Sequence, residues 1–296
     1  MTEQIIESYS HAPSALRFMA RAFRRSPGLA RGAAIPPLAM QWDGIRLGPA
    51  HLEGFCRATG LSATDGVPVL LPQVVGFRLQ MALLTHPAYP LPIWTALQVR
   101  NRLVRHERFD PSERLDLRTG VAQQRAVDKG IEVDLISRLM RGCACVWEGR
   151  TTVFYRGRFG EAAAAAPQAA APDLSQAAAV QRFRMPAGGG WAFGKLTGDY
   201  NGIHWSNWYA RRLGFAQAFS HPQRVAAMCQ SRLSGPAGAA QTLDLWIKGP
   251  VFYGAEVGLN AIDDEQGVRF GLSLQGDTRS ALLGHWRIGA QPLSGT

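Results

Sequence analysis

The chain contains 296 residues, 46% of them hydrophobic, and has a net charge of +10. No stretch approaches the roughly 20 apolar residues that span a bilayer, and the N-terminus lacks the layout of a secretory signal, so we expect a cytoplasmic protein without an integral membrane segment. The charge favours anionic partners, but scattered basic residues and no recognisable nucleic-acid-binding module argue against nucleic acid as a partner.

Residues 1–40 are expected to form an N-terminal arm. Within it, apolar side chains recur at helical spacing, at Leu16, Met19, Ala20 and Phe23. This pattern predicts a helix with one apolar face. Such a helix could lie on a membrane surface, but we favour a helix that packs on the rest of the protein.

Residues 41–160 are expected to form a first repeat that has no catalytic role. Its predicted helix, residues 73–84, is apolar on nearly every face. A helix of this kind cannot lie on a surface, so other elements must wrap around it. Alternating runs between residues 92 and 157 predict antiparallel strands, and a curved sheet of such strands would meet that demand.

The four cysteines show no C-x-x-C spacing, which gives little support to a zinc site or a redox dithiol. Cys143 and Cys145 alternate in a run typical of a strand, so we expect two small core residues on one face. We therefore expect no metal.

An Ala/Pro-rich stretch, residues 161–179, has the composition of a semi-rigid linker. Residues 180–296 are expected to form the second repeat, which carries the catalytic site. Its helix is predicted from Pro222, because proline suits a first helical position, to about Leu233. Alternating runs at 242–262, 268–276 and 280–289 then predict antiparallel strands.

The two halves resemble each other in order, with Pro72-Gln73 and Pro222-Gln223 each opening a helix. They differ in the segment before that helix. Gly60 and Pro72 are 12 residues apart, whereas Gly198 and Pro222 are 24 apart. We infer a duplicated α+β domain in which chemistry belongs to the second copy, while the first copy is free to shape a binding tunnel.

The longer segment carries Asp199, Asn201 and His204, with Gly198 just before them and Gly202 among them. A carboxylate and an imidazole suit proton transfer near neutral pH. The glycines are expected to make turns with positive φ that aim these side chains at one point.

This segment resembles the signature of the MaoC-like dehydratases, also called R-specific enoyl-CoA hydratases, which have the hotdog fold. The residues that match the family motif are Phe193, Leu196, Thr197, Gly198, Asp199, Asn201, Ile203, His204 and Ala210, while Gly202 replaces the family's proline. The direct match covers roughly 20 residues. With the duplicated order of elements, the resemblance implies an α+β double hotdog, with two antiparallel sheets each wrapped around a central helix.

The resemblance also implies roles for the site residues. Asp199 and His204 would be catalytic and would activate water for addition to a 2-enoyl thioester, or run the reverse dehydration of a (3R)-3-hydroxyacyl thioester. Asn201 would hold the carboxylate or the water. The acyl group would be bound to CoA or to an acyl carrier protein, and the family chemistry needs no cofactor.

His221 and Gln223 are expected to bind substrate at the start of the second central helix. The family usually has His-Gly there, and the glycine N–H faces the thioester oxygen. This chain has His221-Pro222, and proline has no N–H to donate. Gln223 would then take over, by its backbone or its side-chain amide.

Two other functions stay open on the sequence alone. One is a hotdog thioesterase, and the other is a non-catalytic protein that binds acyl thioesters. A homodimer of double-hotdog chains is also compatible with the resemblance. Around the motif, Trp205, Trp208, Tyr209 and Phe215 are expected to pack in the protein, and Lys248, Arg211 or Arg212 could meet the phosphates of a carrier.

Overall fold

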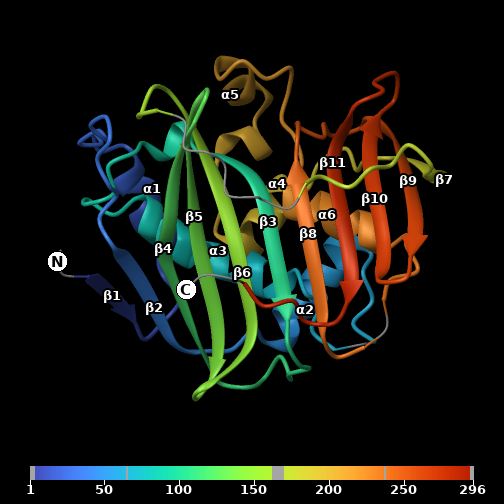
Figure 1. The fold of residues 1–296 in the computed structure, drawn as a ribbon, viewed down its shortest axis with the longest axis horizontal. Helices are drawn as coiled ribbons and strands as arrows, with labels where there is room; N and C mark the ends of the chain where they lie inside the picture. Colours follow the sequence, from blue (N-terminus) through green and yellow to red (C-terminus); the bar gives the residue numbers. More distant parts are fainter. Residues whose placement is uncertain (1–3, 65, 162–169, 237, 294–296) are drawn as a thin grey trace.

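Helix α3 (Leu71–Leu84) forms the centre of the first half, and only Phe77 and Arg78 on it are more than marginally exposed. In the computed structural model, which describes residues 4–64, 66–161, 170–236 and 238–293, the strands curve around this helix and around α6 (Pro222–Gln230) (Figure 1). The predicted helix at 73–84 is thus confirmed, and α6 ends three residues before the predicted Leu233.

The elements of the first half follow the expected order. They are β1 (Ile5–Tyr9), α1 (Ala15–Ala22), β2 (Leu38–Ile45), α2 (Pro49–Thr59), α3, η1 (Ile93–Thr95), β3 (Leu97–Arg105), β4 (Leu115–Val127), β5 (Gly130–Arg141) and β6 (Ala144–Arg156).

The second half repeats this order with one insertion. Its elements are β7 (Ala178–Arg184), α4 (Gly190–Thr197), η2 (Gly202–His204), α5 (Asn207–Arg212), α6, β8 (Gln241–Ile247), β9 (Glu256–Asp264), β10 (Gly267–Leu274) and β11 (Ser280–Ile288). The helices α2 and α4 end at Gly60 and Gly198, both with φ of +78°. The added residues between α4 and α6 hold η2 and α5.

The two predicted antiparallel sheets are joined edge to edge into one continuous sheet. In the described residues, the 11-stranded sheet has the order β1-β2-β4-β5-β6-β3-β8-β11-β10-β9-β7. Strands β3 and β8 pair antiparallel from Arg100 opposite Trp246 to Arg105 opposite Gln241. The physical reason is that each half would otherwise leave the backbone groups of one long strand unpaired. The pairing is antiparallel throughout, except that β1 adds to β2 in parallel.

The sheet order also shows how the halves are related. Each half has a three-strand meander between its first strand and its junction strand: β4, β5 and β6 in the first, β9, β10 and β11 in the second. The order therefore reads as two mirrored halves about the β3–β8 junction, with β1 as an extra edge strand. Both central helices lie on the same side of this sheet (Figure 1).

The N-terminal arm packs on the protein by a different face from the predicted one. Phe18 and Ala22 are buried, whereas Leu16 and Phe23 are 81% and 77% exposed. The carbonyl of Ala22 accepts a hydrogen bond from the Trp94 indole at 2.7 Å. The apolar spacing located the helix, but contact with a distant segment decided its buried face.

The domain boundaries stay a prediction. Of the predicted linker, residues 162–169 lie outside the described residues, and β7 begins at Ala178, inside the predicted linker. In the described part of the chain, no helix is both long and apolar enough to cross a membrane.

The wrapped position of α3 predicts a large effect of trimming it. Leu79 on α3 is fully buried, so Leu79→Ala should lower the free energy of unfolding by about 2–5 kcal/mol through lost burial and a cavity. Denaturant unfolding measures this. Leu16→Ala, on the exposed face of α1, is the matched control and should change stability by less than about 0.5 kcal/mol. Equal effects of the two variants would contradict the described core.

Candidate functional site

A cavity of about 380 Å³ lies between the two halves and is lined by residues of both. The second half contributes Asp199, Asn201, His204, His221 and Gln223. The first half contributes a largely apolar wall with some polar members, including Phe77, Gln80, Met81, Leu84, Ile93, Trp94, Gln98, Val99, Thr151 and Val153. The arm adds Met19 and Ala22 from α1. All five predicted site residues therefore face one cavity.

A ladder of local hydrogen bonds shapes the motif after α4. The Asp199 N–H donates to the Thr197 hydroxyl at 2.9 Å, the Asn201 N–H donates to Asp199 Oδ1 at 3.0 Å, and the Ile203 N–H donates to Asn201 Oδ1 at 3.3 Å. Short polar side chains that bind the backbone two residues on are typical of turns. Each side-chain oxygen in this series thus holds the backbone N–H two residues further along the chain.

These hydrogen bonds occupy one carboxylate oxygen of Asp199 and leave the other available to the cavity. Oδ1 is tied to the backbone of Asn201, while Oδ2 lies 3.6 Å from His204 Nε2 and 3.9 Å from His221 Nε2. The Asn201 side chain itself begins η2. The group of Asn201 that holds the Asp199 carboxylate is therefore its main-chain N–H, and a role of its side chain toward substrate stays a prediction.

The tautomer of His204 follows from its neighbours. Its Nδ1 lies 3.0 Å from the carbonyl oxygen of Phe219, which can only accept a hydrogen bond. Nδ1 therefore carries the proton, and Nε2 of the neutral ring presents a lone pair toward the cavity. Tyr253 holds the main chain here, because its hydroxyl donates to the His204 carbonyl at 2.9 Å.

His221 stacks on His204 with ring centroids 3.8 Å apart. Its Nε2 lies 3.4 Å from the Asp199 carbonyl oxygen, while its buried Nδ1 has no hydrogen-bond partner in the described residues. Burial lowers the pKa of His221 well below its usual value, and the nearby His204 and Arg224 lower it further. Burial also lowers the pKa of His204, although the Asp199 carboxylate opposes this shift. Both rings are thus neutral at pH 7.

The start of α6 departs from the family pattern as the sequence indicates. Pro222 is the first residue of the helix, after His221 as its N-cap. The side-chain amide of Gln223 reaches across to the first half, where it lies 2.7 Å from the side-chain amide of Gln98 on β3. Gln98, which no sequence pattern singles out, therefore belongs to the site.

Only one of the two motif glycines is required for the expected reason. Gly198 has φ of +78° as predicted. Gly202 does not have positive φ, which corrects the prediction; it is required by space, since an added Cβ would lie 2.7 Å from the Tyr209 ring. Gly190, outside the predicted motif, is also required by space, since an added Cβ would lie 1.7 Å from the His204 carbonyl oxygen. The run of three glycines at 188–190 is the sequence signal that could have indicated this close approach.

The flanking side chains divide between cavity and surface. Phe215 and Lys248 line the cavity. Trp205 and Trp208 are 49% and 66% exposed rather than packed inside, which corrects the expectation for them. Arg212 lies over the Trp208 ring, 4.9 Å from its centroid, so this part of α5 forms its contacts on the outside.

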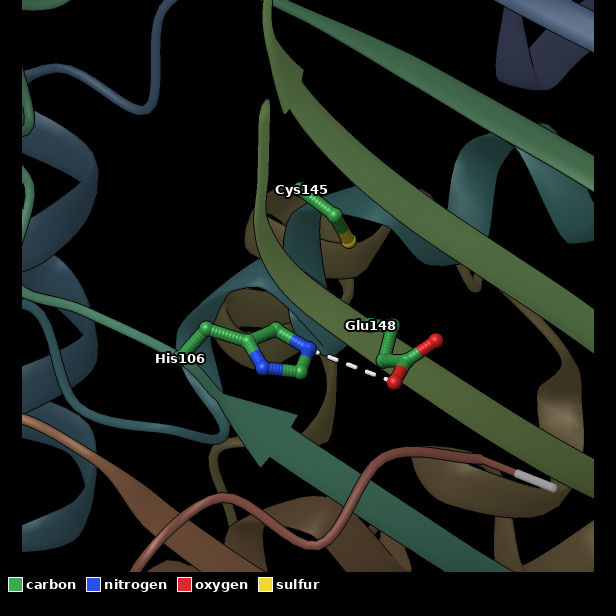
Figure 2. Close-up of side chains that lie close together, drawn as sticks. All are labelled: His106, Cys145 and Glu148. Carbon is green, nitrogen blue, oxygen red and sulfur yellow. Dashed lines mark hydrogen bonds and ion pairs between the residues drawn. The ribbon is translucent and has the colours of Figure 1, made fainter. Parts of the chain in front are cut away.

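Two groups of described residues bring possible metal-ligand atoms within 4.8 Å of one another. One is Asp199, His204 and His221, in the cavity. The other is His106, Cys145 and Glu148 (Figure 2), none of which lines the cavity. Cys145 is half-buried and Cys143 is exposed, so the expected pair of core cysteines is wrong. Cys143 lies in the turn between β5 and β6, where the chain reverses and no core is available.

The ligand atoms of the second group already have partners. Figure 2 shows Glu148 hydrogen-bonded to His106, at 3.2 Å. The same carboxylate also accepts from the Leu293 N–H and lies 3.4 Å from Arg138. Burial, followed by the Glu148 charge, raises the pKa of the Cys145 thiol to about 11, so the sulfur is a protonated thiol at neutral pH. These contacts explain the group as a structural cluster.

The curved half-sheets, each around one helix and joined edge to edge, define a double hotdog fold. A conserved hypothetical protein of Mycobacterium tuberculosis described as a double hotdog is similar in structure, with a TM-score of 0.51, 14% identity, and 88% of this chain and 95% of that one covered. A MaoC-like dehydratase from Phytophthora capsici has a TM-score of 0.69 at 15% identity, with 85% and 94% covered.

A curated relative is similar along most of the chain. This is 3-hydroxyacyl-thioester dehydratase X of Mycobacterium tuberculosis, 23% identical over 257 residues that cover 86% of this chain and 91% of the relative. The crystal structure of HtdX from the same organism has a TM-score of 0.72 at 19% identity, covering 84% of this chain and 99% of that one. No protein-family profile matches the chain. These comparisons confirm the predicted double hotdog fold and the resemblance to the MaoC-like dehydratases.

The buried histidines predict a loss of stability in acid. A histidine whose pKa is lowered by folding takes up protons more readily when unfolded, so stability falls as the pH drops from the unfolded value near 6.5 through the lower folded value. The free energy of unfolding should therefore be lower at pH 5 than at pH 7.5. In His221→Asn this difference should shrink, whereas exposed His11→Asn should keep it. Urea unfolding at both pH values tests the prediction, and an unchanged difference in His221→Asn would contradict it.

Proposed function

We propose that this protein is a hydro-lyase that reversibly hydrates a 2-enoyl thioester to a (3R)-3-hydroxyacyl thioester. The observation that carries the proposal is the pair of atoms Asp199 Oδ2 and His204 Nε2, 3.6 Å apart at the cavity. Both atoms are hydrogen-bond acceptors, since the His204 proton is on Nδ1. They are too far apart to bond each other directly, so a water molecule that donates one hydrogen to each would bridge them.

This arrangement suits attack by water on a conjugated double bond. His204 Nε2 accepts a proton as the water oxygen bonds to C3, while Asp199 keeps the water oriented and stabilises the charged imidazole. The electrons of the C2–C3 double bond move toward the thioester oxygen, forming an enolate. The proton held by His204 is then returned to C2, and the same steps in reverse give dehydration.

The thioester oxygen must be stabilised as it gains charge. We place it near the start of α6, where His221, Pro222 and Gln223 line the cavity. The first N–H groups of a helix have no intrahelical acceptors and suit an anion. Pro222 cannot contribute one, so donors must come from Gln223 or beyond.

The acyl chain is proposed to lie along the first half. Apolar residues such as Met81, Leu84 and Val153 line the cavity there, and burial of a hydrocarbon against them is favourable. Lys248 is exposed and lines the same cavity, so it can meet the phosphates of CoA or of an acyl carrier protein.

A cytoplasmic location is part of the proposal. It is supported by the four cysteines, which are all within the described residues and all free. The homodimer compatible with the family resemblance stays a prediction.

Changing either Asp199 or His204 should strongly reduce turnover. In Asp199→Asn and in His204→Ala, the hydration rate should fall by about 10²–10⁴, the usual contribution of general acid–base catalysis. Loss of absorbance of the conjugated enoyl thioester measures it, over a panel of CoA and carrier-protein substrates with chiral analysis of the product. Asp277→Asn, at a side chain that is 37% exposed and lies outside the cavity lining, is the matched carboxylate control and should keep the wild-type rate.

The same assay separates the other two functions. Release of free thiol would indicate a thioesterase, and tight binding of enoyl thioesters without turnover across chain lengths would indicate a binding protein. Undiminished hydration in both the Asp199 and His204 variants would refute the proposed site.

The pH dependence of the rate should report His204. The reaction needs its neutral form, and burial lowers its pKa. The value of kcat/KM should therefore stay level from pH 8 down past the ordinary histidine value of about 6.5, and fall only at lower pH. A decline that begins above pH 7 would contradict the role given to the neutral ring.

A further inference from the structure

A series of hydrogen-bonded side-chain amides, buried except for half-buried Gln98, connects the start of α6 with the first half. Gln223 on α6 contacts Gln98 at 2.7 Å, Gln98 contacts Asn101 at 2.5 Å, and Asn101 contacts Thr151 at 3.0 Å. Gln98 and Asn101 are on β3, and Thr151 is on β6. This series of hydrogen-bonded side chains crosses from the second half into the first and passes along the cavity wall.

At its far end the chain meets two glutamines of α3. The Nε2 atoms of Gln73 and Gln80 both lie 3.0 Å from Thr151 Oγ1, and both side chains are only 1% exposed. The two amides also face each other, with their N–O pairs at 3.3 and 3.4 Å. Thr151 is therefore surrounded by three amides, those of Gln73, Gln80 and Asn101.

A hydroxyl group cannot satisfy three donors. It accepts at most two hydrogen bonds and donates one, so one of the three amides must present its oxygen to Thr151. The O and N atoms of an amide have nearly the same shape, and their assignment follows from the hydrogen-bond network. The number of hydrogen bonds that the Thr151 hydroxyl can accept and donate thus determines the donor-to-acceptor direction along the series of amides.

Asn101 is the residue that must present oxygen. Turning one of the two α3 glutamines would set nitrogen against nitrogen and oxygen against oxygen in their mutual contact. Turning both would place two oxygens against the single hydroxyl hydrogen of Thr151. With Gln73 and Gln80 as donors, Thr151 donates to Asn101 Oδ1, and every atom at this junction has a partner.

The orientation of Asn101 then determines the orientation of Gln98 and, through Gln98, that of Gln223 at the cavity. Asn101 Nδ2 donates to Gln98 Oε1, Gln98 Nε2 donates to Gln223 Oε1, and the Gln223 amide nitrogen is left as the outer atom. The structure gives the outer amide atom of Gln223 no hydrogen bond to the described residues, and Gln223 lines the same cavity as Asp199 and His204. A buried amide N–H₂ facing a cavity is a hydrogen-bond donor available to a ligand.

We propose that Gln223 Nε2 supplies the hydrogen bond to the thioester oxygen that the missing N–H of Pro222 would otherwise give, and that Gln98, Asn101 and Thr151 position it. This inference rests on the proposed hydratase function. It makes Gln223 a catalytic residue by its side chain, and makes the other three positioning residues. The first half then contributes to catalysis through the orientation of an amide as well as through the cavity wall.

Kinetics of two variants test the proposal. Gln223→Leu should lower kcat by about 10²–10³, the cost of one oxyanion donor, with KM changed by less than about threefold because the bond strengthens in the transition state. Asn101→Asp is nearly isosteric and lies away from the reacting atoms, but the new side chain presents an acceptor oxygen to both neighbours. Gln98 must then exchange its amide O and N positions to donate to it, Gln223 must do the same, and Gln223 Oε1 would face the cavity. This variant should lower kcat in the same way, although it makes no contact with the reacting atoms.

Ser137→Ala is the matched control. Ser137 is buried and lies 3.4 Å from Gln80 Nε2, in the same polar cluster but outside the chain of amides, so this variant should keep the wild-type kcat. An active wild-type enzyme with an unchanged kcat in Gln223→Leu would overturn the inference while the proposed function stands. If kcat fell as much in Ser137→Ala as in Asn101→Asp, the series of amides would have only a structural role, and its positioning function would be overturned.

Neutron diffraction on deuterated wild-type crystals gives a test that does not depend on turnover or on a variant that folds. Two deuterons are expected on the Gln223 amide atom that faces the cavity, and none on the Asn101 atom that faces Thr151. Oxygen at the cavity position of Gln223 would overturn the inference. A wild-type enzyme inactive on the whole substrate panel, but with the expected deuterons, would refute the hydratase function and leave the amide orientation established.

Discussion

The antiparallel pairing of β3 with β8 is the constraint on which the site depends. It joins the two halves into one sheet and places α3 and α6 on the same side of it (Figure 1). The buried guanidinium of Arg105 stabilises this junction, since it donates to the carbonyls of Gly238, Ala239 and Val67. Because Gln98 is on β3, the same pairing brings it within reach of Gln223 on α6. A cavity with one catalytic wall and one binding wall follows from this geometry.

The second half fixes its chemical groups largely by backbone contacts. Asp199 is held through Oδ1 by a main-chain N–H, and His204 through Nδ1 by a main-chain carbonyl. In both residues the atom left over, Oδ2 or Nε2, faces the cavity. Such contacts orient a side chain with little dependence on distant packing, so the arrangement requires mainly the local turn and the chain segment at Phe219. This explains why a short sequence motif carries so much of the site.

The parts that could be predicted from the sequence are those set by local pattern. The apolar circumference of α3, the proline at the start of α6 and the spacing from Asp199 to His204 each specify a local structure without reference to the rest of the chain. The parts that could not be predicted depend on contacts that only the folded chain brings together. The buried face of α1 is decided partly by Trp94, the requirement for glycine at 202 by the Tyr209 ring, and the joining of the sheets by the open edges of β3 and β8. The role of Gln98 belongs to the same class, because nothing in its own segment marks a glutamine that meets another one 125 residues away.

An open sheet that ends in two single strands has a consequence for behaviour at high concentration. Strand β7 forms one edge, is exposed along most of its length, and carries Arg182 and Arg184. Strand β1 forms the other edge and is only five residues long, with Glu7 at its centre. Short edge strands with charged side chains oppose edge-to-edge pairing of sheets from different molecules. The charges on these two strands therefore act against self-association by the same backbone pairing that joins the halves within one molecule.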